Sequence, residues 1–153
     1  MKITSTAFEN NGNLPKKYTC EGEGSNPPLA FLDVPRGTKS LALIIEDPDA
    51  VSKKPWIHWV LFNISPNVRF IKEGSEPSNS QEGVNDSGEN AYGPACPPVG
   101  SGVHHYEFRL FALDEKLEDM PDFTDKDMLV EAMHGHVLEQ ANLIGLYQNS
   151  KDQ

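Results

Sequence analysis

Five polar side chains interrupt apolar stretches of the sequence in a way that could build a small binding pocket. Asp47 and Asp49 directly follow one apolar run, and His58 lies inside a second. His104 and Tyr106 share one face of a third run by alternation. An unpaired imidazole is costly in an apolar strand, so His58 and His104 need polar partners or a ligand. Read singly, each residue also suits an ordinary turn or a hydrogen-bonded core position.

Together, these residue types could hold an acidic ligand. An ionised carboxylate repels an anion, so we expect Asp47 to accept a hydrogen bond from one imidazole and thereby fix its tautomer. His58 and His104 would donate hydrogen bonds to the anion. The ring of Tyr106 would form part of the pocket wall, and its hydroxyl would be a further donor. Each charge-assisted hydrogen bond contributes roughly 1.5–3 kcal/mol, which predicts about millimolar or somewhat tighter phosphate binding. Binding should be tighter at about pH 6 than at about pH 8.

A loop rich in glycine and proline, residues 92–102, lies beside these side chains in the sequence. Gly100 and Gly102 allow backbone N–H groups to approach a ligand closely. Pro97 and Pro98 stiffen the loop and so lower the entropy cost of ordering it on binding. We therefore expect this loop to form part of the binding site.

The same residues also suit an enzyme. Two histidines and a carboxylate match the ligand count of a metal site with an open position, but no H-E-x-x-H motif is present. A Ser-His-Asp arrangement for nucleophilic catalysis is a further alternative, but no G-x-S-x-G motif occurs. Ser101 lies between Gly100 and Gly102, which is typical of a flexible loop residue. We expect a binding site without a metal or cofactor. A metal-dependent or other hydrolase is the alternative.

Three apolar runs indicate the strands that would carry these residues. The run at 39–46 has no polar break, which is typical of a buried strand. The run at 56–64 is apolar on both faces and suits a central strand, and 105–113 alternates with one more polar face. Shorter strands are expected near 3–8 and 30–32. This pattern predicts a mainly β protein, an antiparallel β-sandwich with one or two short helices.

The rest of the chain contains one expected helix and one long loop. Residues 72–89 have almost no apolar side chain, which indicates an exposed loop. Thr124 can cap a helix whose apolar residues recur at helical spacing, with Gly135 as a stop signal. Residues 141–147 alternate as a strand does, but their apolar positions also suit a helix. No repeat is visible, so we expect residues 1–153 to form a single domain.

Composition narrows the range of partners. The chain has 153 residues and a formal net charge of −10, which disfavours nucleic acids and anionic bilayers but still allows a local anion pocket. No apolar stretch is long enough for insertion into a membrane. The N-terminus has no secretion signal, so we expect a cytoplasmic protein. Cys20 and Cys96 form no C-x-x-C pair and are expected to be reduced, although a bridge between them stays open.

Three spaced motifs resemble one known family. They are Asp47-Pro48-Asp49, Trp56-x-His58-Trp59 and Cys96-Pro97-Pro98-x-Gly100-x-Gly102-x-His104-x-Tyr106-x-Phe108. With blocks at 18–22, 26–29, 85–86 and 131–136, they are similar to the phosphatidylethanolamine-binding proteins, also called Raf-kinase-inhibitor-like proteins. The resemblance runs from residue 18 to about residue 147. The blocks around Cys20 and Cys96 are similar to the bacterial and archaeal branch.

The resemblance implies a β-sandwich with an anion-binding pocket at one end and a strand at 141–147. It implies a protein that is not an enzyme and that binds a small phosphorylated or otherwise anionic ligand, such as a phospholipid head group. A phosphoprotein or a kinase is an alternative partner, since a phosphorylated side chain is also an anion. An antiparallel sandwich can also form a homodimer through a sheet face. The residues implied to line the pocket, with Asp49 close by, are Asp47, His58, Pro97, Pro98, His104 and Tyr106.

The chain departs from the family pattern at positions near the expected pocket. Val51 stands where proline is usual, and Pro94 changes the usual Tyr-Gly-Gly-Pro-Cys stretch. These two differences bear on loop shape. His105 stands where arginine is common, and Ser87 replaces an aromatic residue. These two bear on the pocket rim and therefore on the identity of the ligand.

Overall fold

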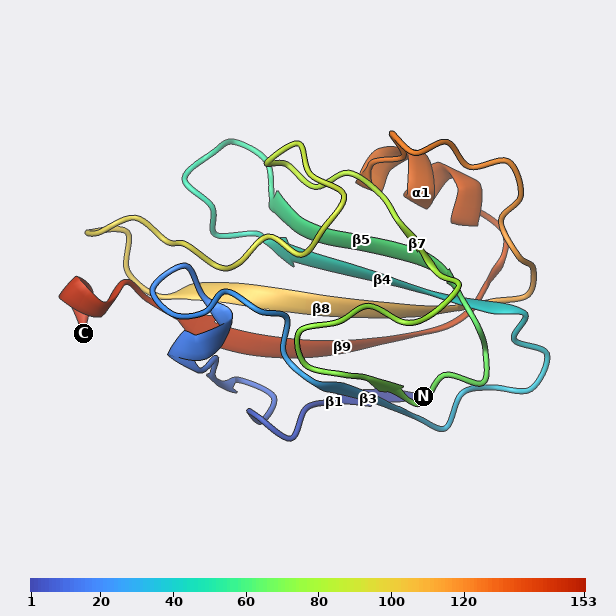
Figure 1. Cartoon of the computed structure of the whole chain (residues 1–153), viewed down its shortest axis with the longest axis horizontal. Coiled ribbons are helices and arrows are strands. Elements are labelled where there is room, and N and C mark those ends of the chain that lie inside the picture. Colours follow the sequence, from blue (N-terminus) through green and yellow to red (C-terminus); the bar gives the residue numbers. More distant parts are fainter.

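The computed structural model describes residues 1–153 as two β-sheets with one short α-helix. The larger sheet has the strand order β2-β9-β8-β4-β5-β7, and the smaller sheet has the order β1-β3-β6 (Figure 1). The predicted mainly β fold is confirmed. The elements are β1 (Lys2–Thr4), β2 (Gly12–Asn13), η1 (Lys16–Tyr18), β3 (Leu29–Leu32), β4 (Ser40–Asp47), β5 (Trp56–Ile64), β6 (Phe70–Ile71), β7 (Gln81–Glu82), β8 (His104–Leu113), α1 (Lys126–Met133), β9 (Val137–Tyr147) and η2 (Ser150–Asp152).

Four long strands form the centre of the larger sheet. β4 pairs antiparallel with β5 and β8, and β8 pairs antiparallel with β9, whereas β2 is parallel to β9. Because β4 runs opposite to both neighbours, its C-terminal end lies beside the starts of β5 and β8. Residues 141–147 belong to β9, so the segment that suited either a strand or a helix is a strand, as the family resemblance implied.

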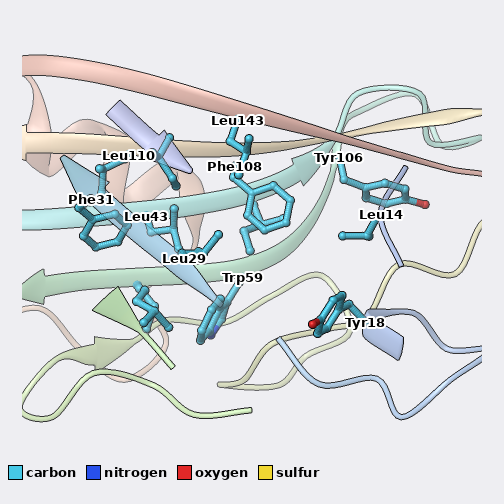
Figure 2. Packing of buried hydrophobic residues seen from close by; sticks show 14 of the residues in the cluster. Leu14, Tyr18, Leu29, Phe31, Leu43, Trp59, Tyr106, Phe108, Leu110 and Leu143 are labelled. Atoms are coloured by element: carbon cyan, nitrogen blue, oxygen red, sulfur yellow. The ribbon is translucent and has the colours of Figure 1, made fainter. Parts of the chain in front are cut away.

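The larger sheet buries apolar side chains on both of its faces. On β4, Leu43 packs in the core between the two sheets, and its neighbour Ile44 faces a second core under α1. Figure 2 shows Trp59 and Phe108 in the first core, among residues from several strands. This two-sided burial explains why β4 and β5 have continuous apolar sequences, since neither face is left to solvent.

The N-cap of α1 lies one residue after the predicted cap, Thr124. Asp125 is the N-cap, and its side chain accepts a hydrogen bond from the Met128 N–H at 2.9 Å. The predicted cap, Thr124, is buried and donates its hydroxyl to the Pro121 carbonyl at 2.6 Å. The prediction was wrong because Thr124 and Asp125 are both good cap residues, and the preceding turn uses the hydroxyl of the first.

Several smaller expectations differ from the structure. All peptide bonds are trans, including those before Pro28 and Pro98. The strand expected at 3–8 is limited to β1, and Phe8 beyond it packs against Phe108. Residues 72–89 are mostly loop, but they include the short edge strand β7. No helix combines the length and the apolar character that a membrane crossing requires.

Candidate functional site

The starts of β5 and β8 and the end of β4 form one side of a cavity of about 300 Å³. Asp47 is the last residue of β4, and His104 is the first residue of β8. Asp47, His104 and Tyr106 lie on the sheet face that packs in the core between the two sheets, because they alternate in step with Ile45 and Phe108. The predicted site residues that line the cavity are Asp47, His58, Pro97, Pro98, His104 and Tyr106.

A β-bulge brings His58 to the same cavity. Ile45 of β4 pairs with Trp59, whereas the next residue, Glu46, pairs with Ile57, so His58 is an extra residue in β5. Such a bulge re-aims a side chain that strict alternation would place on the other face. The His58 ring lies 5.4 Å from the ring of Tyr106, edge to face. Simple alternation along 56–64 could not have revealed this change of side.

Asp47 and His104 form a buried pair. The Asp47 Oδ2 atom lies 2.6 Å from His104 Nδ1, and their residues are 4% and 1% exposed. Asp47 Oδ1 accepts the Asp49 backbone N–H at 2.8 Å, so both carboxylate oxygens are engaged. On the other side of the ring, His104 Nε2 lies 2.8 Å from the Ser101 hydroxyl oxygen. The expectation that Asp47 orients one imidazole is therefore met at His104.

His58 has a different environment from His104. Its Nδ1 atom donates to the Gly93 carbonyl at 2.8 Å, and the Gly93 N–H donates back to the His58 carbonyl at 2.8 Å. Burial lowers the pKa of His58 below its usual value, although the Gly93 carbonyl and the Asp47 charge act in the opposite direction. A neutral ring with its proton on Nδ1 leaves Nε2 as the nitrogen available to a ligand.

Tyr106 contributes an uncharged hydroxyl to the cavity. Its residue is 2% exposed, and burial raises the pKa of Tyr106 far above the usual tyrosine value, with a smaller contribution from Asp47. The hydroxyl forms no hydrogen bond within the chain. It therefore remains a hydrogen-bond donor at any physiological pH.

Three predicted site residues lie at the edge of the site and do not line the cavity. Asp49 accepts hydrogen bonds from His105 at its backbone N–H and at ring Nδ1, at 2.8 and 2.6 Å. Burial opposes ionisation of Asp49, but these bonds outweigh it and lower its pKa. The Gly100 N–H, expected to approach a ligand, instead donates to the Asp152 carboxylate at 2.8 Å. Gly102 shares the left-handed conformation of Gly100, with φ of 77° and 88°.

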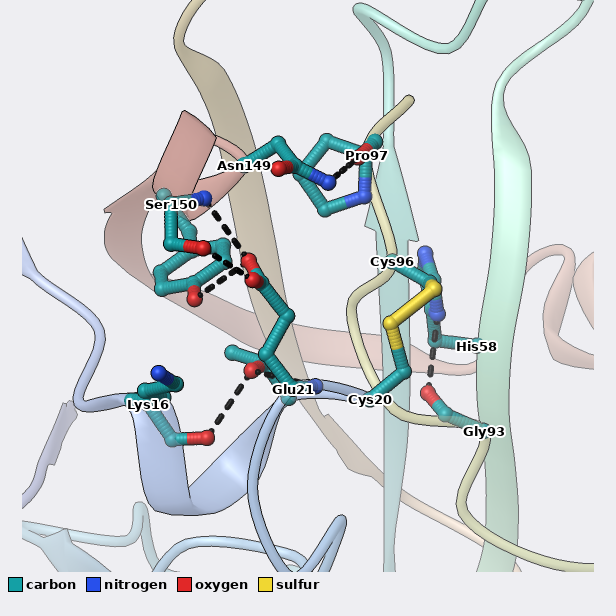
Figure 3. The surroundings of a disulfide bond; sticks show 11 residues. Lys16, Cys20, Glu21, His58, Gly93, Cys96, Pro97, Asn149 and Ser150 are labelled. Carbon is teal, nitrogen blue, oxygen red and sulfur yellow. Dashed lines mark hydrogen bonds between the residues drawn. A yellow bond between two sulfur atoms is a disulfide. The ribbon is translucent and has the colours of Figure 1, made fainter. Parts of the chain in front are cut away.

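The cysteines are bonded, which corrects the expectation that they are reduced. Cys20 and Cys96 form a disulfide across 76 residues, and Figure 3 shows it beside His58 and the Gly93 carbonyl. A parallel bridge between Thr19 and Ala95 brings the two segments together. Because Cys96 lines the cavity, the disulfide ties one wall of the site to the N-terminal part of the chain. Nothing in the spacing of the two cysteines indicated this proximity.

The C-terminal segment supports the same wall, which the sequence did not indicate. Asn149 donates its side-chain amide to the Pro97 carbonyl at 3.2 Å (Figure 3). Glu21 accepts hydrogen bonds from the Ser150 N–H at 2.9 Å, from the Ser150 hydroxyl, and from the Tyr147 hydroxyl at 2.8 Å. Bonds from Ser150 lower the pKa of Glu21. The Gly/Pro loop is therefore held from outside the cavity.

A buried asparagine organises the opposite wall. Asn85 is 4% exposed, donates to the Ala91 carbonyl at 2.8 Å and accepts the Ser87 N–H at 2.9 Å. Its neighbour Asp86 accepts the Ile57 N–H at 2.8 Å and so attaches this loop to β5. The Asn85-Asp86 motif was part of the family resemblance, but its structural role is visible only in three dimensions.

Comparisons with known proteins agree with this fold. Residues 4–148 match the family described as phosphatidylethanolamine-binding protein. A UPF0098 protein of Methanothermobacter thermautotrophicus is 50% identical over 97% of this chain and 99% of its own length. The crystal structure of a phosphatidylethanolamine-binding protein homolog from Chlamydia trachomatis has a TM-score of 0.91 and 44% identity, with 97% of each chain covered. Escherichia coli YbcL has a TM-score of 0.90 and 28% identity, with 97% of this chain and 98% of YbcL covered.

The two sheets and the cavity at the ends of the central strands define a β-sandwich protein with a pocket at one end. The chain belongs to the phosphatidylethanolamine-binding protein family, in agreement with the resemblance drawn from its motifs. Its relatives include UPF0098 proteins of archaea and bacteria, as the blocks around Cys20 and Cys96 predicted.

Proposed function

We propose that the chain binds small phosphoryl-type anions in the cavity, as a binding protein for a phosphorylated small molecule. The observation that carries this proposal is the pairing of Asp47 with His104 at 2.6 Å inside a cavity that also holds His58 and the free Tyr106 hydroxyl. The carboxylate that would repel an anion is already engaged by an imidazole and a backbone N–H. The remaining polar groups of the cavity are donors or can become donors.

A proton accompanies the anion into the cavity. With Nδ1 donating to Gly93, neutral His58 offers only a lone pair at Nε2, which repels a phosphate oxygen unless a proton lies between them. That proton comes either from solution to the ring or from the phosphate itself. In both cases binding takes up a proton relative to free phosphate dianion, so affinity rises as pH falls.

The cavity rim favours an anion that has an organic group. Val51 is 76% exposed and Trp56 is 38% exposed, and both line the cavity. The volume of about 300 Å³ is at the lower end of the range for small-molecule sites. A phosphate monoester with a small apolar or aromatic substituent fits this combination. Phospholipid head groups and phosphorylated side chains belong to this ligand class.

A phosphate titration followed by NMR tests the proposal. We expect the ring signals of His58 to shift with a dissociation constant near about 1 mM and with tighter binding at about pH 6 than at about pH 8. His58→Asn retains an N–H for Gly93 but removes Nε2, so it should weaken binding roughly 10- to 100-fold. The matched control His134→Asn changes an exposed histidine at the end of α1 and should bind as the parent does. No shift at His58, or equal affinity at both pH values, would contradict the proposal.

A further inference from the structure

Ser101, His104 and Asp47 form a continuous hydrogen-bonded chain that anion binding does not require. The Ser101 hydroxyl oxygen lies 2.8 Å from His104 Nε2, and His104 Nδ1 lies 2.6 Å from Asp47 Oδ2. This is the connectivity of a nucleophile, a general base and a carboxylate that orients the base. We propose that Ser101 is the nucleophile of an acyl-transfer site that hydrolyses small carboxylic esters.

The imidazole is held in the tautomer that this role requires. Asp47 is buried, and its second oxygen is occupied by the Asp49 N–H, so Oδ2 is directed at His104 Nδ1. A proton on Nδ1 leaves Nε2 as a lone pair facing the Ser101 hydroxyl. The β4–β8 pairing fixes this geometry, because it places the end of β4 beside the start of β8.

Ser101 is held in a defined turn, although the sequence favoured a flexible loop residue. Its backbone N–H and its hydroxyl both lie within hydrogen-bond distance of the Pro98 carbonyl, at 3.2 and 2.7 Å. Gly100 and Gly102 on either side have φ of 88° and 77°. The single hydroxyl hydrogen can be donated to the Pro98 carbonyl or, after rotation, to His104 Nε2. The second arrangement is the reactive one.

A donor for the developing oxyanion is available next to Ser101. The Gly102 N–H makes no hydrogen bond within the chain. In serine hydrolases with a sharp turn at the nucleophile, the N–H of the following residue is one of the oxyanion donors. Ser101 itself is half-buried, and Pro98 and His104 beside it line the cavity of about 300 Å³, which can accommodate one part of a small ester.

The reaction balances without a cofactor. Ser101 Oγ attacks the ester carbonyl carbon and forms a C–O bond while its proton moves to His104 Nε2, and the Asp47 carboxylate stabilises the imidazolium. The tetrahedral adduct then breaks its bond to the alcohol oxygen, and the alcohol leaves with the proton from Nε2. Water gives a proton to Nε2 and attacks the acyl group on Ser101, which releases the carboxylic acid and restores the hydroxyl.

Ester hydrolysis and phosphate binding should depend on pH in opposite directions. The base must be neutral, so hydrolysis rises with pH, whereas phosphate affinity falls with pH because binding takes up a proton. Asp47→Asn tests Asp47 as a positioning residue, because it should change the pH profile of hydrolysis as well as its rate. A loss of folding alone would not move the profile.

The test uses p-nitrophenyl acetate hydrolysis and a fluorophosphonate probe on the full-length protein, with the labelled residue mapped by mass spectrometry. We expect the probe to modify Ser101, and Ser101→Ala to lower protein-dependent hydrolysis by more than about 100-fold. Ser78→Ala, which changes an exposed serine in the 72–89 loop, should retain the parental rate. Retained phosphate shifts at His58 show that Ser101→Ala is folded.

Three outcomes would overturn this inference: no hydrolysis by the parent protein, unchanged hydrolysis in Ser101→Ala, or labelling that does not select Ser101. Each of them leaves the proposed anion binding intact if phosphate still shifts His58. Conversely, Ser101-dependent hydrolysis without a phosphate shift would support this inference and contradict the proposed function.

Discussion

Burial of His58 places its ring at the cavity and also disfavours the charged form of that ring. Its ring is enclosed near Tyr106 and donates to Gly93, and its pKa is lowered chiefly by burial. An anion in the cavity would supply the charge that the imidazolium lacks. The lowered pKa favours a neutral ring in the free cavity, and under the proposed function a bound anion would favour its protonation.

The lowered pKa of His58 makes stability depend on pH. In the unfolded chain His58 is protonated below its ordinary pKa of 6.5, whereas in the folded chain it stays neutral to lower pH. The contribution of His58 to stability is therefore fully present above pH 6.5 and is lost as the pH falls from 6.5 to the lower pKa of the folded state. His58→Asn retains a donor to Gly93 and should show a smaller loss of stability between about pH 6.5 and pH 5. Urea unfolding at several pH values measures it.

The matched control for this experiment is again His134→Asn, whose exposed side chain does not line the cavity. It should retain the parental pH dependence. If His58→Asn and the parent lose the same free energy of unfolding over this pH range, burial of His58 does not control its protonation.

At the scale of elements, α1 is attached to the sheet through a buried carboxylate. Glu46 of β4 lies 2.6 Å from Arg109 and 2.5 Å from Lys126, the first residue of the helix. Burial would raise the pKa of Glu46, but the hydrogen bonds from Lys126 and Arg109 outweigh it and lower the pKa. The start of α1 is thus fixed both by this ion pair and by its cap.

The cap of α1 gives a prediction at this scale. Asp125→Ala removes the acceptor for the Met128 N–H and should lower the free energy of unfolding by about 1 kcal/mol. Asp125→Asn retains a side-chain oxygen at the same place and should stay within about 0.5 kcal/mol of the parent. Urea unfolding compares the two variants. Equal losses for both would mean that the charge of Asp125 matters more than its hydrogen bond.

The elements themselves were largely predictable, because their apolar patterns are local. β4, β5 and β8 follow from continuous or alternating apolar runs, and the antiparallel order then brings Asp47, His104 and Tyr106 together. The bulge at His58 was not predictable, since it depends on how β4 and β5 pair. Periodicity left 141–147 open for the same reason, because pairing with β8 decides it.

At the scale of the whole molecule, contacts between distant parts of the chain hold the site, and the sequence did not reveal them. The Cys20–Cys96 disulfide and the Asn149 contact to Pro97 reach the Gly/Pro loop from the two ends of the chain. Asp152 contacts the same loop at Gly100. The type of a residue does not reveal which distant residue it will contact, so the shape of the cavity depends on the complete fold.

Removal of the disulfide should therefore affect stability and binding together. The bond closes a loop across 76 residues, and its loss should lower the free energy of unfolding by roughly 2–5 kcal/mol. Cys96 lines the cavity, so a loosened wall should also weaken phosphate binding at conditions where the protein stays folded. Urea unfolding and the phosphate titration of Cys20→Ala/Cys96→Ala, beside the parent with and without reductant, measure both effects. Reductant should affect the parent and leave the double variant unchanged. Unaltered phosphate affinity in the folded double variant would mean that Asn149 and the C-terminal segment position this wall without the disulfide.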